Sequence, residues 1–279
     1  MTIHQTLTDA TRQLSEAQVP DPAQDALLML ASILNKDPLS VRLDGAKELS
    51  PDDSARYRAL LLHRANREPL QYLLGEQWFY GLPFYVDNRV LIPRQETESL
   101  CEIGIQHLKK LVAPTALDLC TGSGAIAVTL KHYCPHASVS AADLSQDALS
   151  VAKENARRHL AEIAFFQGDL FAPLKGHAFD LILSNPPYIE TEACKTLQTE
   201  VLKEPLMALD GGDDGLDFYR RIAAESHQHL NAGGLLAMEV GSTQAQAVAD
   251  LLAAKNTYRD IAIVRDLYGL DRIVKAYKE

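Results

Sequence analysis

Four consecutive residues, Asn185-Pro186-Pro187-Tyr188, combine groups that could hold a planar nitrogen group. They directly follow an apolar run, 179–184, which is typical of a buried β-strand. The two prolines fix an extended backbone and remove two N–H donors, so this loop presents free carbonyl groups. The Asn185 side-chain carbonyl and the Pro186 main-chain carbonyl could accept both hydrogens of one –NH₂ group, beside the flat ring of Tyr188. The pattern favours an amide, or the exocyclic amine of adenine or cytosine, as the bound group; a surface turn with prolines is the alternative.

Such a tetrad suits the transfer of a methyl group to a weakly nucleophilic nitrogen. The lone pair of an amide nitrogen is delocalised, and two fixed acceptors allow the nitrogen to pyramidalise and aim that lone pair at an electrophilic methyl group. No strong general base is required, because the proton becomes acidic only as the N–C bond forms. We therefore expect Asn185, Pro186 and Tyr188 to be catalytic, and these three with Pro187 to bind the substrate.

A glycine-rich segment upstream of the tetrad has the features of a cofactor loop. It follows a predicted strand, 116–119, and precedes a helical segment. Glycines permit positive φ and close approach of a ligand, and a helix N-terminus favours an anionic group. The spacing Gly122-x-Gly124-x-x-Ala127 also fits the dinucleotide fingerprint, so the loop alone does not separate NAD from S-adenosyl-L-methionine (AdoMet), and a turn without a ligand is a third interpretation. The candidate cofactor-binding residues of this loop are Cys120, Thr121, Gly122, Ser123 and Gly124.

Two acidic residues follow the next two predicted strands. Asp143 lies 21 residues beyond Gly122, where a carboxylate accepts hydrogen bonds from ribose hydroxyls of either cofactor. Its alternative role is to cap the following helix, which Ser145 could also do. Asp169 is placed to contact an adenine edge, with Leu170 against the ring, although a plain turn aspartate is the alternative. Acidic and carbonyl groups suit the cationic methionine portion of AdoMet better than the pyrophosphate of NAD.

The elements that must position these residues alternate between strand and helix after Glu96. Apolar runs typical of strands occupy 116–119, 137–141, 163–166, 179–183, 234–240, 261–264 and 272–276. Helical segments separate the first five runs, which predicts an α/β fold with a parallel, doubly wound sheet. The last two runs are joined by 266–271, too short for a crossover helix, so they should pair antiparallel. Seven strands with a terminal antiparallel hairpin resemble the Rossmann-like class I AdoMet-dependent methyltransferases.

The first 75 residues have helical periodicity only, interrupted by prolines. Ser50-Pro51 predicts the start of a helix that runs through Arg67. Its basic residues, between Arg56 and Arg67, form either a solvated face or a surface that meets an acidic partner. The aromatic segment 78–86, with Gly81-Leu82-Pro83 as its turn, predicts a β-hairpin. We therefore predict a small all-α substrate-docking domain over 1–75, a hairpin linker over 76–94 and an AdoMet-dependent methyltransferase domain over 95–279.

Composition excludes several classes of protein. The 279 residues are 47% hydrophobic and 23% charged, which argues against a disordered chain or a disulfide-stapled miniprotein. The 27 basic and 37 acidic residues give a net charge of −10, opposite to that of most proteins that bind duplex DNA. The four cysteines have no paired spacing, and we find neither a metal-site pattern nor a signal peptide nor a membrane span. These features predict a cytoplasmic protein without a metal.

Further motifs indicate a specific resemblance. An Asn-Pro-Pro-Tyr tetrad behind a glycine-rich loop is similar to that of the amino-methyltransferases, which include adenine-N6 DNA enzymes and glutamine-N5 protein enzymes. The segment Pro93-Arg94-x-x-Thr97-Glu98 resembles that of the PrmC/HemK family, which methylates a glutamine in peptide chain release factors. Segments similar to that family also occur at Glu204-Pro205, Gly211-Gly212-x-Asp214-Gly215-Leu216, Glu239-Val240-Gly241 and Asp266-Leu267-x-Gly269-x-x-Arg272. With the helical domain, the resemblance covers essentially the whole chain.

The resemblance implies roles for individual residues. Contacts to AdoMet, whose product is S-adenosyl-L-homocysteine, would come from Thr121, Gly122, Ser123, Gly124, Asp143 and Asn185. The tetrad would hold a glutamine in a Gly-Gly-Gln loop, and Arg94 and Glu98 would shape the entrance. One departure is visible, because Cys120 stands at the first glycine of the family's Asp-x-Gly-x-Gly-x-Gly pattern. A side chain there constrains φ and crowds the methionine moiety, so we expect weakened AdoMet binding.

The resemblance therefore predicts an AdoMet-dependent enzyme that methylates the side-chain amide nitrogen (N5) of the Gly-Gly-Gln glutamine in class 1 peptide chain release factors. It would act as a monomer, without a membrane or a direct nucleic-acid partner. Glutamine-N5 methylation of a ribosomal protein is the nearest alternative, because it shares the tetrad. N6-adenine methylation of nucleic acid is a second, against which the net charge of −10 argues. A cofactor-binding protein without turnover is a third, although a mere binder has no need of two aimed acceptors.

Overall fold

The computed structural model describes residues 1–266 and 268–279, and the chain divides into two compact units. One unit comprises Met1–Glu76 together with Gln198–Lys203, and the other comprises Gln77–Leu197 and Glu204–Glu279. The sequence patterns do not predict that the later segment, Gln198–Lys203, packs with the helical residues. Leu267, in the predicted connection between the last two strands, lies outside the described residues.

The first unit is built from helices whose starts are encoded locally. They are α1 (Ile3–Glu16), α2 (Pro22–Leu34), α3 (Pro38–Leu43), α4 (Pro51–Ala65) and α5 (Leu70–Leu74). Proline occupies the first turn of α2, α3 and α4, where its missing N–H costs nothing. Ser50 caps α4 by accepting a hydrogen bond from the Asp53 N–H at 3.0 Å. The helix ends at Ala65, earlier than predicted, and Arg67 already has a left-handed backbone with φ of +63°.

The basic residues of α4 are not a uniformly solvated face. Arg64 is only 4% exposed, and its Nε donates to the Asp25 carboxylate at 2.7 Å. Arg64 and Arg67 both also donate to Glu200 of the returning segment. Arg64 and Arg67 therefore do contact acidic groups, but these groups belong to the chain itself and not to a separate partner.

The second unit begins with a two-stranded hairpin. Strand β1 (Gln77–Phe79) pairs antiparallel with β2 (Leu82–Phe84). The turn is Tyr80-Gly81, with φ of +49° and +76°, and not the predicted Gly81-Leu82-Pro83. A two-residue turn of this kind needs positive φ at both positions, which matches the right-handed twist of the paired strands.

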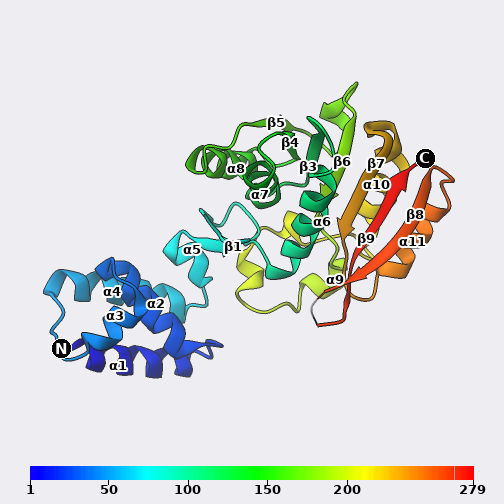
Figure 1. Cartoon of the computed structure of the whole chain (residues 1–279). Coiled ribbons are helices and arrows are strands. Elements are labelled where there is room, and N and C mark those ends of the chain that lie inside the picture. The colour runs from blue at the N-terminus through cyan, green and yellow to red at the C-terminus, as the bar shows by residue number, and fades with distance from the viewer. Residues whose placement is uncertain (267) are drawn as a thin grey trace. The chain divides into compact units, whose positions relative to one another are not determined.

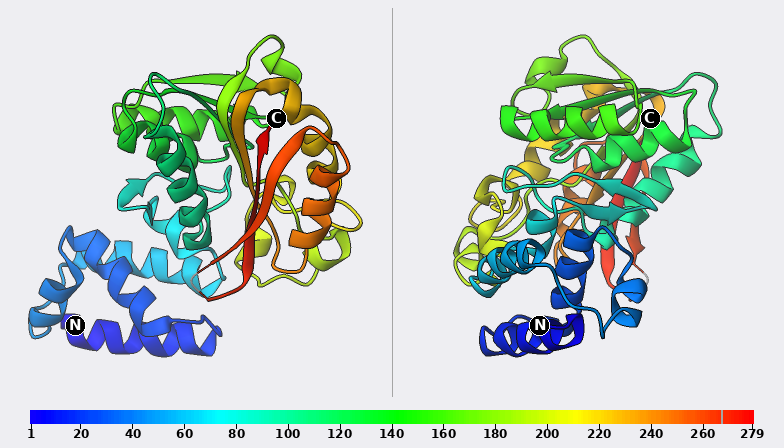
Figure 2. Two further views of the ribbon diagram at one scale, coloured as in Figure 1. Left: turned by 45° about the vertical axis from the view of Figure 1, so that its right-hand side comes forward. Right: turned by 90° about the vertical axis from the view of Figure 1, so that its left-hand side faces the viewer.

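A seven-stranded sheet forms the centre of this unit, over the residues described. Its strands are β3 (Thr115–Leu119), β4 (Ser138–Asp143), β5 (Ile163–Gln167), β6 (Phe179–Ser184), β7 (Leu230–Glu239), β8 (Tyr258–Arg265) and β9 (Asp271–Lys278). The order is β5-β4-β3-β6-β7-β9-β8, in which β9 runs antiparallel to both of its neighbours and the other pairs are parallel. The predicted class I methyltransferase fold, with its terminal antiparallel hairpin, is confirmed. The two views in Figure 2 show that hairpin in orange and red along one edge of the sheet.

Helices cover both faces of the sheet (Figure 1). One face packs on α6 (Glu98–Leu108), α7 (Ala125–Tyr133) and α8 (Gln146–Arg158), and the other on α10 (Asp217–Glu225) and α11 (Ala245–Ala253). Neighbouring strand residues belong to opposite cores, as Leu181 and Ile182 do, because successive side chains of a strand point to opposite faces. Both cores are therefore apolar, which explains the continuous hydrophobic runs in the sequence.

Short elements complete the connections. The helix α9 (Thr191–Cys194) follows the tetrad, and 3₁₀ turns occur at η1 (Gln95–Thr97), η2 (Ala172–Leu174), η3 (Val201–Lys203), η4 (Leu206–Ala208) and η5 (Ser226–His229). Strand β7 begins earlier than the predicted 234, because a register shift opposite Phe179 and Leu181 accommodates Gly233 at φ of +74°. In the part of the chain described, no helix combines the length and apolar character needed to cross a bilayer.

Candidate active site

A cavity of about 430 Å³ lies at the carboxyl ends of β3, β4, β5 and β6. The chain connections diverge between β3 and β6, since β3 leads outward to β4 and β5 while β6 leads to β7 on the other side. Such a switch point is where doubly wound sheets bind ligands. The predicted residues that line the cavity are Cys120, Thr121, Gly122, Ser123, Asp143, Asp169, Leu170, Asn185, Pro187 and Arg94.

The glycine loop after β3 owes its shape to several left-handed residues. Gly122 has φ of +54°, and Cys120 has φ of +63°, so cysteine occupies a conformation that favours glycine. Gly124 is not among the lining residues. Its φ is +80°, and a Cβ there would lie 3.0 Å from the Ala152 Cβ on α8. Gly124 therefore serves the close packing of the loop on α8.

Asp143 ties the glycine loop to the end of β4. Its Oδ2 accepts from the Gly122 N–H at 2.8 Å, and its Oδ1 accepts from the Ser145 N–H at 2.9 Å. Burial raises the pKa of this carboxyl above its ordinary value. Ser145, not Asp143, caps α8, because its hydroxyl accepts from the Ala148 N–H at 3.1 Å. A carboxylate offers about four lone-pair positions, so Asp143 retains acceptor capacity toward the cavity.

A second carboxyl, that of Asp118, also holds the glycine loop through hydrogen bonds. It was not among the site residues predicted from the sequence. Asp118 on β3 is fully buried and accepts from the Thr121 hydroxyl at 2.5 Å and from the Ala127 N–H at 3.1 Å. Burial raises its pKa to about 7. An acidic residue inside an otherwise apolar strand was the available signal, since such residues are seldom fully buried without a partner.

Asp169 and Leu170 lie together on the cavity wall after β5. The Asp169 carboxylate forms an ion pair with Arg221 of α10, with 2.7 Å between Oδ2 and Nη2. Leu170 is buried and has φ of +46°. Arg221 comes from a distant helix, so no local pattern in the sequence pointed to it.

The four residues of the tetrad face different surroundings. Asn185 and Pro187 line the cavity, whereas Pro186 is buried and is not among the lining residues. The Asn185 Nδ2 donates to the Thr97 hydroxyl at 3.2 Å. The Tyr188 ring packs against the core of the α10 and α11 face, outside the cavity lining, and burial raises the pKa of its hydroxyl to about 12.

Neighbouring loops hold the backbone of the tetrad in place. The Gln244 Nε2 donates to the Tyr188 carbonyl at 2.9 Å, and the Ile189 N–H donates to the Leu209 carbonyl at 2.9 Å. Gly211 lies directly against this backbone, and a Cβ there would be 2.7 Å from the Tyr188 Cα. Both Gly211 and Gln244 are therefore structural supports of the tetrad, and spacing in the sequence did not reveal Gln244.

Arg94 and Glu98, the two residues expected at the entrance, lie at different places in the structure, and only Arg94 is at the cavity. Arg94 lines the cavity, and its Nη2 donates to the buried Glu204 carboxylate at 2.5 Å. Glu204 also accepts from the Ile92 N–H at 3.0 Å. The structure does not bring Glu98 to the cavity lining, because its carboxylate accepts from the Tyr80 N–H at 2.8 Å and so holds the turn of the hairpin.

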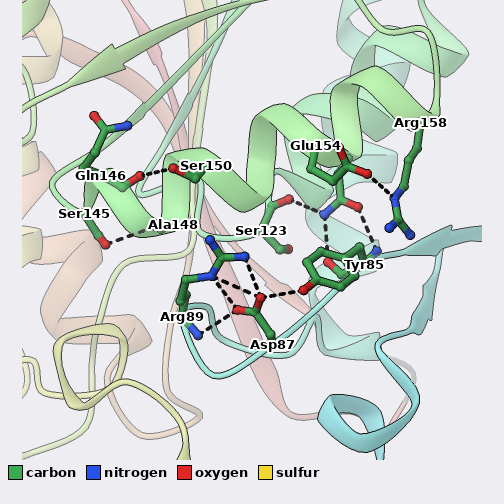
Figure 3. A network of polar contacts seen from close by, with 11 residues as sticks. Tyr85, Asp87, Arg89, Ser123, Ser145, Gln146, Ala148, Ser150, Glu154 and Arg158 are labelled. Carbon is green, nitrogen blue, oxygen red and sulfur yellow. Dashed lines mark hydrogen bonds and ion pairs between the residues drawn. The ribbon is translucent and has the colours of Figure 1, made fainter.

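A polar network, shown in Figure 3, joins the segment after the hairpin to the cofactor loop. Asp87 accepts from the Tyr85 hydroxyl at 2.8 Å and from Arg89, whose Nη2 lies at 2.6 Å and whose side chain lines the cavity. The buried Asn155 amide bonds to the Tyr85 backbone and donates to the Ser123 carbonyl, with Nδ2 2.9 Å from each carbonyl oxygen. Asn155 and Tyr85 therefore help to hold the cofactor loop, although neither was predicted as a site residue from the sequence.

Comparison with known proteins extends these observations to the whole chain. The Methyltransferase small domain family matches residues 96–262, and the PrmC N-terminal domain family matches residues 5–75. The release factor glutamine methyltransferase of Moorella thermoacetica is 44% identical over 282 residues, covering 100% of this chain and 99% of that protein. The protein of the same name from Geobacter sulfurreducens is 41% identical over 274 residues, covering 98% and 95%.

Among solved structures, a methyltransferase from Pyrococcus furiosus has a TM-score of 0.53 at 18% identity, covering 80% of this chain and 98% of that one. This likeness supports the fold. The two release factor glutamine methyltransferases match this chain across both units at more than 40% identity. The chain belongs to the release factor glutamine methyltransferase family.

Proposed function

We propose that this protein transfers a methyl group from AdoMet to the side-chain amide nitrogen (N5) of the Gly-Gly-Gln glutamine in class 1 peptide chain release factors. The observation that carries the proposal is that Asn185 and the glycine loop, with Asp143, line one cavity. A cofactor and an amide acceptor can therefore meet there. The names of the relatives, which share sequence across nearly the full length, support the release factor as substrate.

The residues of the cavity fit AdoMet better than a dinucleotide. Pyrophosphate needs free N–H groups at the glycine loop, but the Gly122 N–H bonds to Asp143 and the Ala127 N–H bonds to Asp118. The negative charge of Asp143 repels a phosphate and attracts a ligand with cationic groups. A volume of about 430 Å³ also lies within the ordinary range for small-molecule sites. When bound, AdoMet supplies an electrophilic methyl group.

We propose that Asp143 accepts from ribose hydroxyls and that Asp169 and Leu170 contact the adenine. The loop residues Cys120, Thr121, Gly122 and Ser123 would surround the methionine end. Gly124 acts through packing on α8, and Arg94 shapes the entrance.

The tetrad then works by orientation. The Asn185 side-chain carbonyl and the Pro186 main-chain carbonyl accept the two N–H groups of the glutamine amide, which fixes the direction of the nitrogen lone pair. As the N–C bond forms, the N–H groups become more acidic and both hydrogen bonds strengthen. The stiff Pro186-Pro187 backbone keeps the acceptors in place without reorganisation. The proton that the amide nitrogen loses on methylation passes to water, so the tetrad needs no side-chain base.

The first unit, together with its returning segment, is proposed to dock the release factor. We further propose that the enzyme acts as a monomer in the cytoplasm and does not contact nucleic acid directly. The net charge of −10 disfavours binding to phosphates.

Transfer of labelled methyl from AdoMet to a recombinant class 1 release factor tests the proposal. The factor with its Gly-Gly-Gln glutamine changed to alanine, a ribosomal protein fraction and duplex DNA are the controls. Label on the intact factor alone is the expected result. Label on ribosomal protein or DNA would reassign the substrate while keeping the cofactor, and no label on any acceptor would contradict the proposal.

A further inference from the structure

We infer that Leu206 and Met207, at the mouth of the cavity, contact the glycine backbone of the release factor loop and so set how tightly this substrate binds. The inference rests on the proposed function, in which a glutamine that follows two glycines enters the cavity. Leu206 and Met207 are the first two residues of η4, in the chain segment after the tetrad. Neither was predicted as a site residue from the sequence.

The lining of the cavity consists of a buried floor and an exposed rim. Leu119 at the end of β3 and Leu170 after β5 are 1% and 5% exposed. Among the described residues, the large apolar side chains that both line the cavity and are exposed are Leu144, Leu206 and Met207. Leu206 is 59% exposed and Met207 is 49% exposed, and neither belongs to the apolar cores of the described chain. Both side chains are therefore available to a molecule that enters the cavity.

Hydrogen bonds hold the turn that carries Leu206 and Met207 beside the tetrad. The Leu209 carbonyl accepts from the N–H of Ile189, the residue after the tetrad, at 2.9 Å, and the Gly211 N–H donates to the Ile189 carbonyl at 2.8 Å. Within the turn, the Leu206 carbonyl accepts from the N–H groups of Leu209 and Asp210, each at 2.9 Å. Because the turn is already fixed in this way, its backbone has little freedom to lose when a substrate binds.

A substrate glutamine that reaches Asn185 must leave its own backbone at the mouth of the cavity, because its side chain is short. Asn185, Leu206 and Met207 line the same cavity, so the residues next to that glutamine lie over the two apolar side chains. Glycine has no side chain, and its main chain can therefore approach such a surface closely. Contact removes the glycine CH₂ groups and the two apolar side chains from water, which favours binding.

The charges around the cavity favour an uncharged peptide over a nucleic acid. Among the described residues, the cationic side chains in the lining are those of Arg89 and Arg94. Each is paired with a carboxylate, Arg89 with Asp87 at 2.6 Å and Arg94 with Glu204 at 2.5 Å. Asp210, just after the turn, adds a carboxylate to the lining. The described lining therefore has no unpaired cation for a phosphate, which disfavours DNA or RNA as the molecule that lies over Leu206 and Met207.

Substitution of the two apolar residues tests the contact. Leu206→Gln and Met207→Gln keep a side chain of similar length and remove much of its apolar surface. Leu270→Gln is the matched control, since Leu270 is also 49% exposed in the same unit but does not line the cavity. We expect each of the first two substitutions to raise KM for the release factor about fivefold, and the double variant about twentyfold, with kcat within about twofold of wild type. Leu270→Gln should match the wild type.

A second readout needs no methyl transfer. Isothermal titration of the release factor into enzyme loaded with S-adenosyl-L-homocysteine gives the Kd of the complex, which should rise by the same factors as KM. The Kd for S-adenosyl-L-homocysteine itself and the melting temperature should not change, because Leu206 and Met207 are exposed and lie at the substrate end of the cavity. An adenine-rich single-stranded oligonucleotide should not compete with the release factor.

The outcomes distinguish this inference from the proposed function. If the wild type methylates the release factor and the double variant has the same KM and Kd for it, the inference is overturned and the function stands. An equal rise in Leu270→Gln, or a matching loss of S-adenosyl-L-homocysteine affinity or melting temperature in the double variant, would also overturn the inference. Competition by the oligonucleotide that is lost in the double variant would assign Leu206 and Met207 to a nucleic acid instead. If the wild type methylates no release factor, the proposed function fails and the inference fails with it.

Discussion

Arg64 of α4 and Glu200 form an ion pair with 3.0 Å between Nη2 and Oε1, although 136 residues separate them in the chain. Arg67, two residues beyond the end of α4, adds contacts to both Glu200 oxygens, at 2.6 and 2.5 Å. Glu200 lies between the tetrad and Glu204, the partner of Arg94 at the cavity. Gln198–Lys203, which includes Glu200, therefore packs within the helical unit.

The Glu200 ion pairs should make stability depend on pH in the acidic range. Burial raises the pKa of Glu200, but hydrogen bonds from Arg67 and Arg64 outweigh burial and hold the pKa at about 2. Because the folded-state pKa is below the ordinary value of 4.5, this stabilisation is present above pH 4.5 and is lost as the pH falls through about 2. Glu200→Gln should therefore lower the free energy of unfolding by about 2 kcal/mol at neutral pH, and the difference from wild type should shrink below pH 4.5.

Urea unfolding followed by circular dichroism measures this difference. Glu192→Gln is the control, because Glu192 pairs with Lys195 at 2.6 Å while its side chain is 82% exposed. Solvent screening should limit its effect to below about 0.5 kcal/mol. Equal effects of the two substitutions at neutral pH would contradict the assignment.

Cys120→Gly should strengthen AdoMet binding. Cysteine at φ of +63° holds a strained backbone in the cofactor loop, and glycine adopts this conformation freely. We expect the Kd for AdoMet to fall severalfold, measured by isothermal titration. Cys120→Ala separates two causes, because it removes the sulfur but keeps the Cβ and its strain. Equal affinities in wild type and Cys120→Gly would show that cysteine at this position of the family pattern does not weaken AdoMet binding.

Gly124→Ala and Gly176→Ala form a matched pair. Both glycines have φ of +80°, but a Cβ at Gly124 would meet Ala152 at 3.0 Å, whereas a Cβ at Gly176 would meet nothing within 4 Å. Gly176→Ala should cost about 1 kcal/mol of stability through backbone strain alone. Gly124→Ala should cost about 3 kcal/mol, since the loop must also move away from α8, and should weaken AdoMet binding. Chemical denaturation and titration of both variants test this, and a similar loss in both would refute the packing role of Gly124.

Glu239→Gln should make stability less sensitive to pH. Burial raises the pKa of Glu239 to about 7, against hydrogen bonding by Thr97 and the charge of Arg272, which lower it. With the folded-state pKa above the ordinary 4.5, the stability from the protonated carboxyl is full below pH 4.5 and is lost as the pH rises through about 7. Neutral glutamine avoids that loss, so Glu239→Gln should exceed wild type by about 2 kcal/mol in mildly alkaline solution and match it below pH 4.5.

Denaturation curves across this pH range provide the measurement, with the exposed Glu162→Gln as control. A difference between Glu239→Gln and wild type that does not vary with pH would disprove the titration of Glu239 in the folded protein.

Local patterns in the sequence are sufficient to predict most of the helices and strands, and the edge of the sheet at which the candidate site lies. Strand runs, the Ser50 cap and the glycine loop are local signals, because they depend on residues a few positions apart. Parallel strands end at one edge of the sheet, so the order of elements alone placed Asp143 and Asn185 near each other. The hairpin turn lies one residue earlier than predicted, because Tyr80 and Gly81 take the positive φ of a two-residue turn while Leu82 and Pro83 already pair with β1.

Which side chains contact one another depends on the packing of elements that are distant in the sequence. Thr97 bonds to Asn185, Arg221 pairs with Asp169, and Glu200 pairs with Arg64, each across a long stretch of chain. These contacts depend on how several helices pack against one sheet, and no spacing within the sequence carries that information. In the same packing, Gly124 lies against α8 and Glu98 bonds to the turn of the hairpin. Neither residue lines the cavity. Short sequence patterns show which residue types are available for the chemistry, whereas the contacts between them depend on the close packing of the interior.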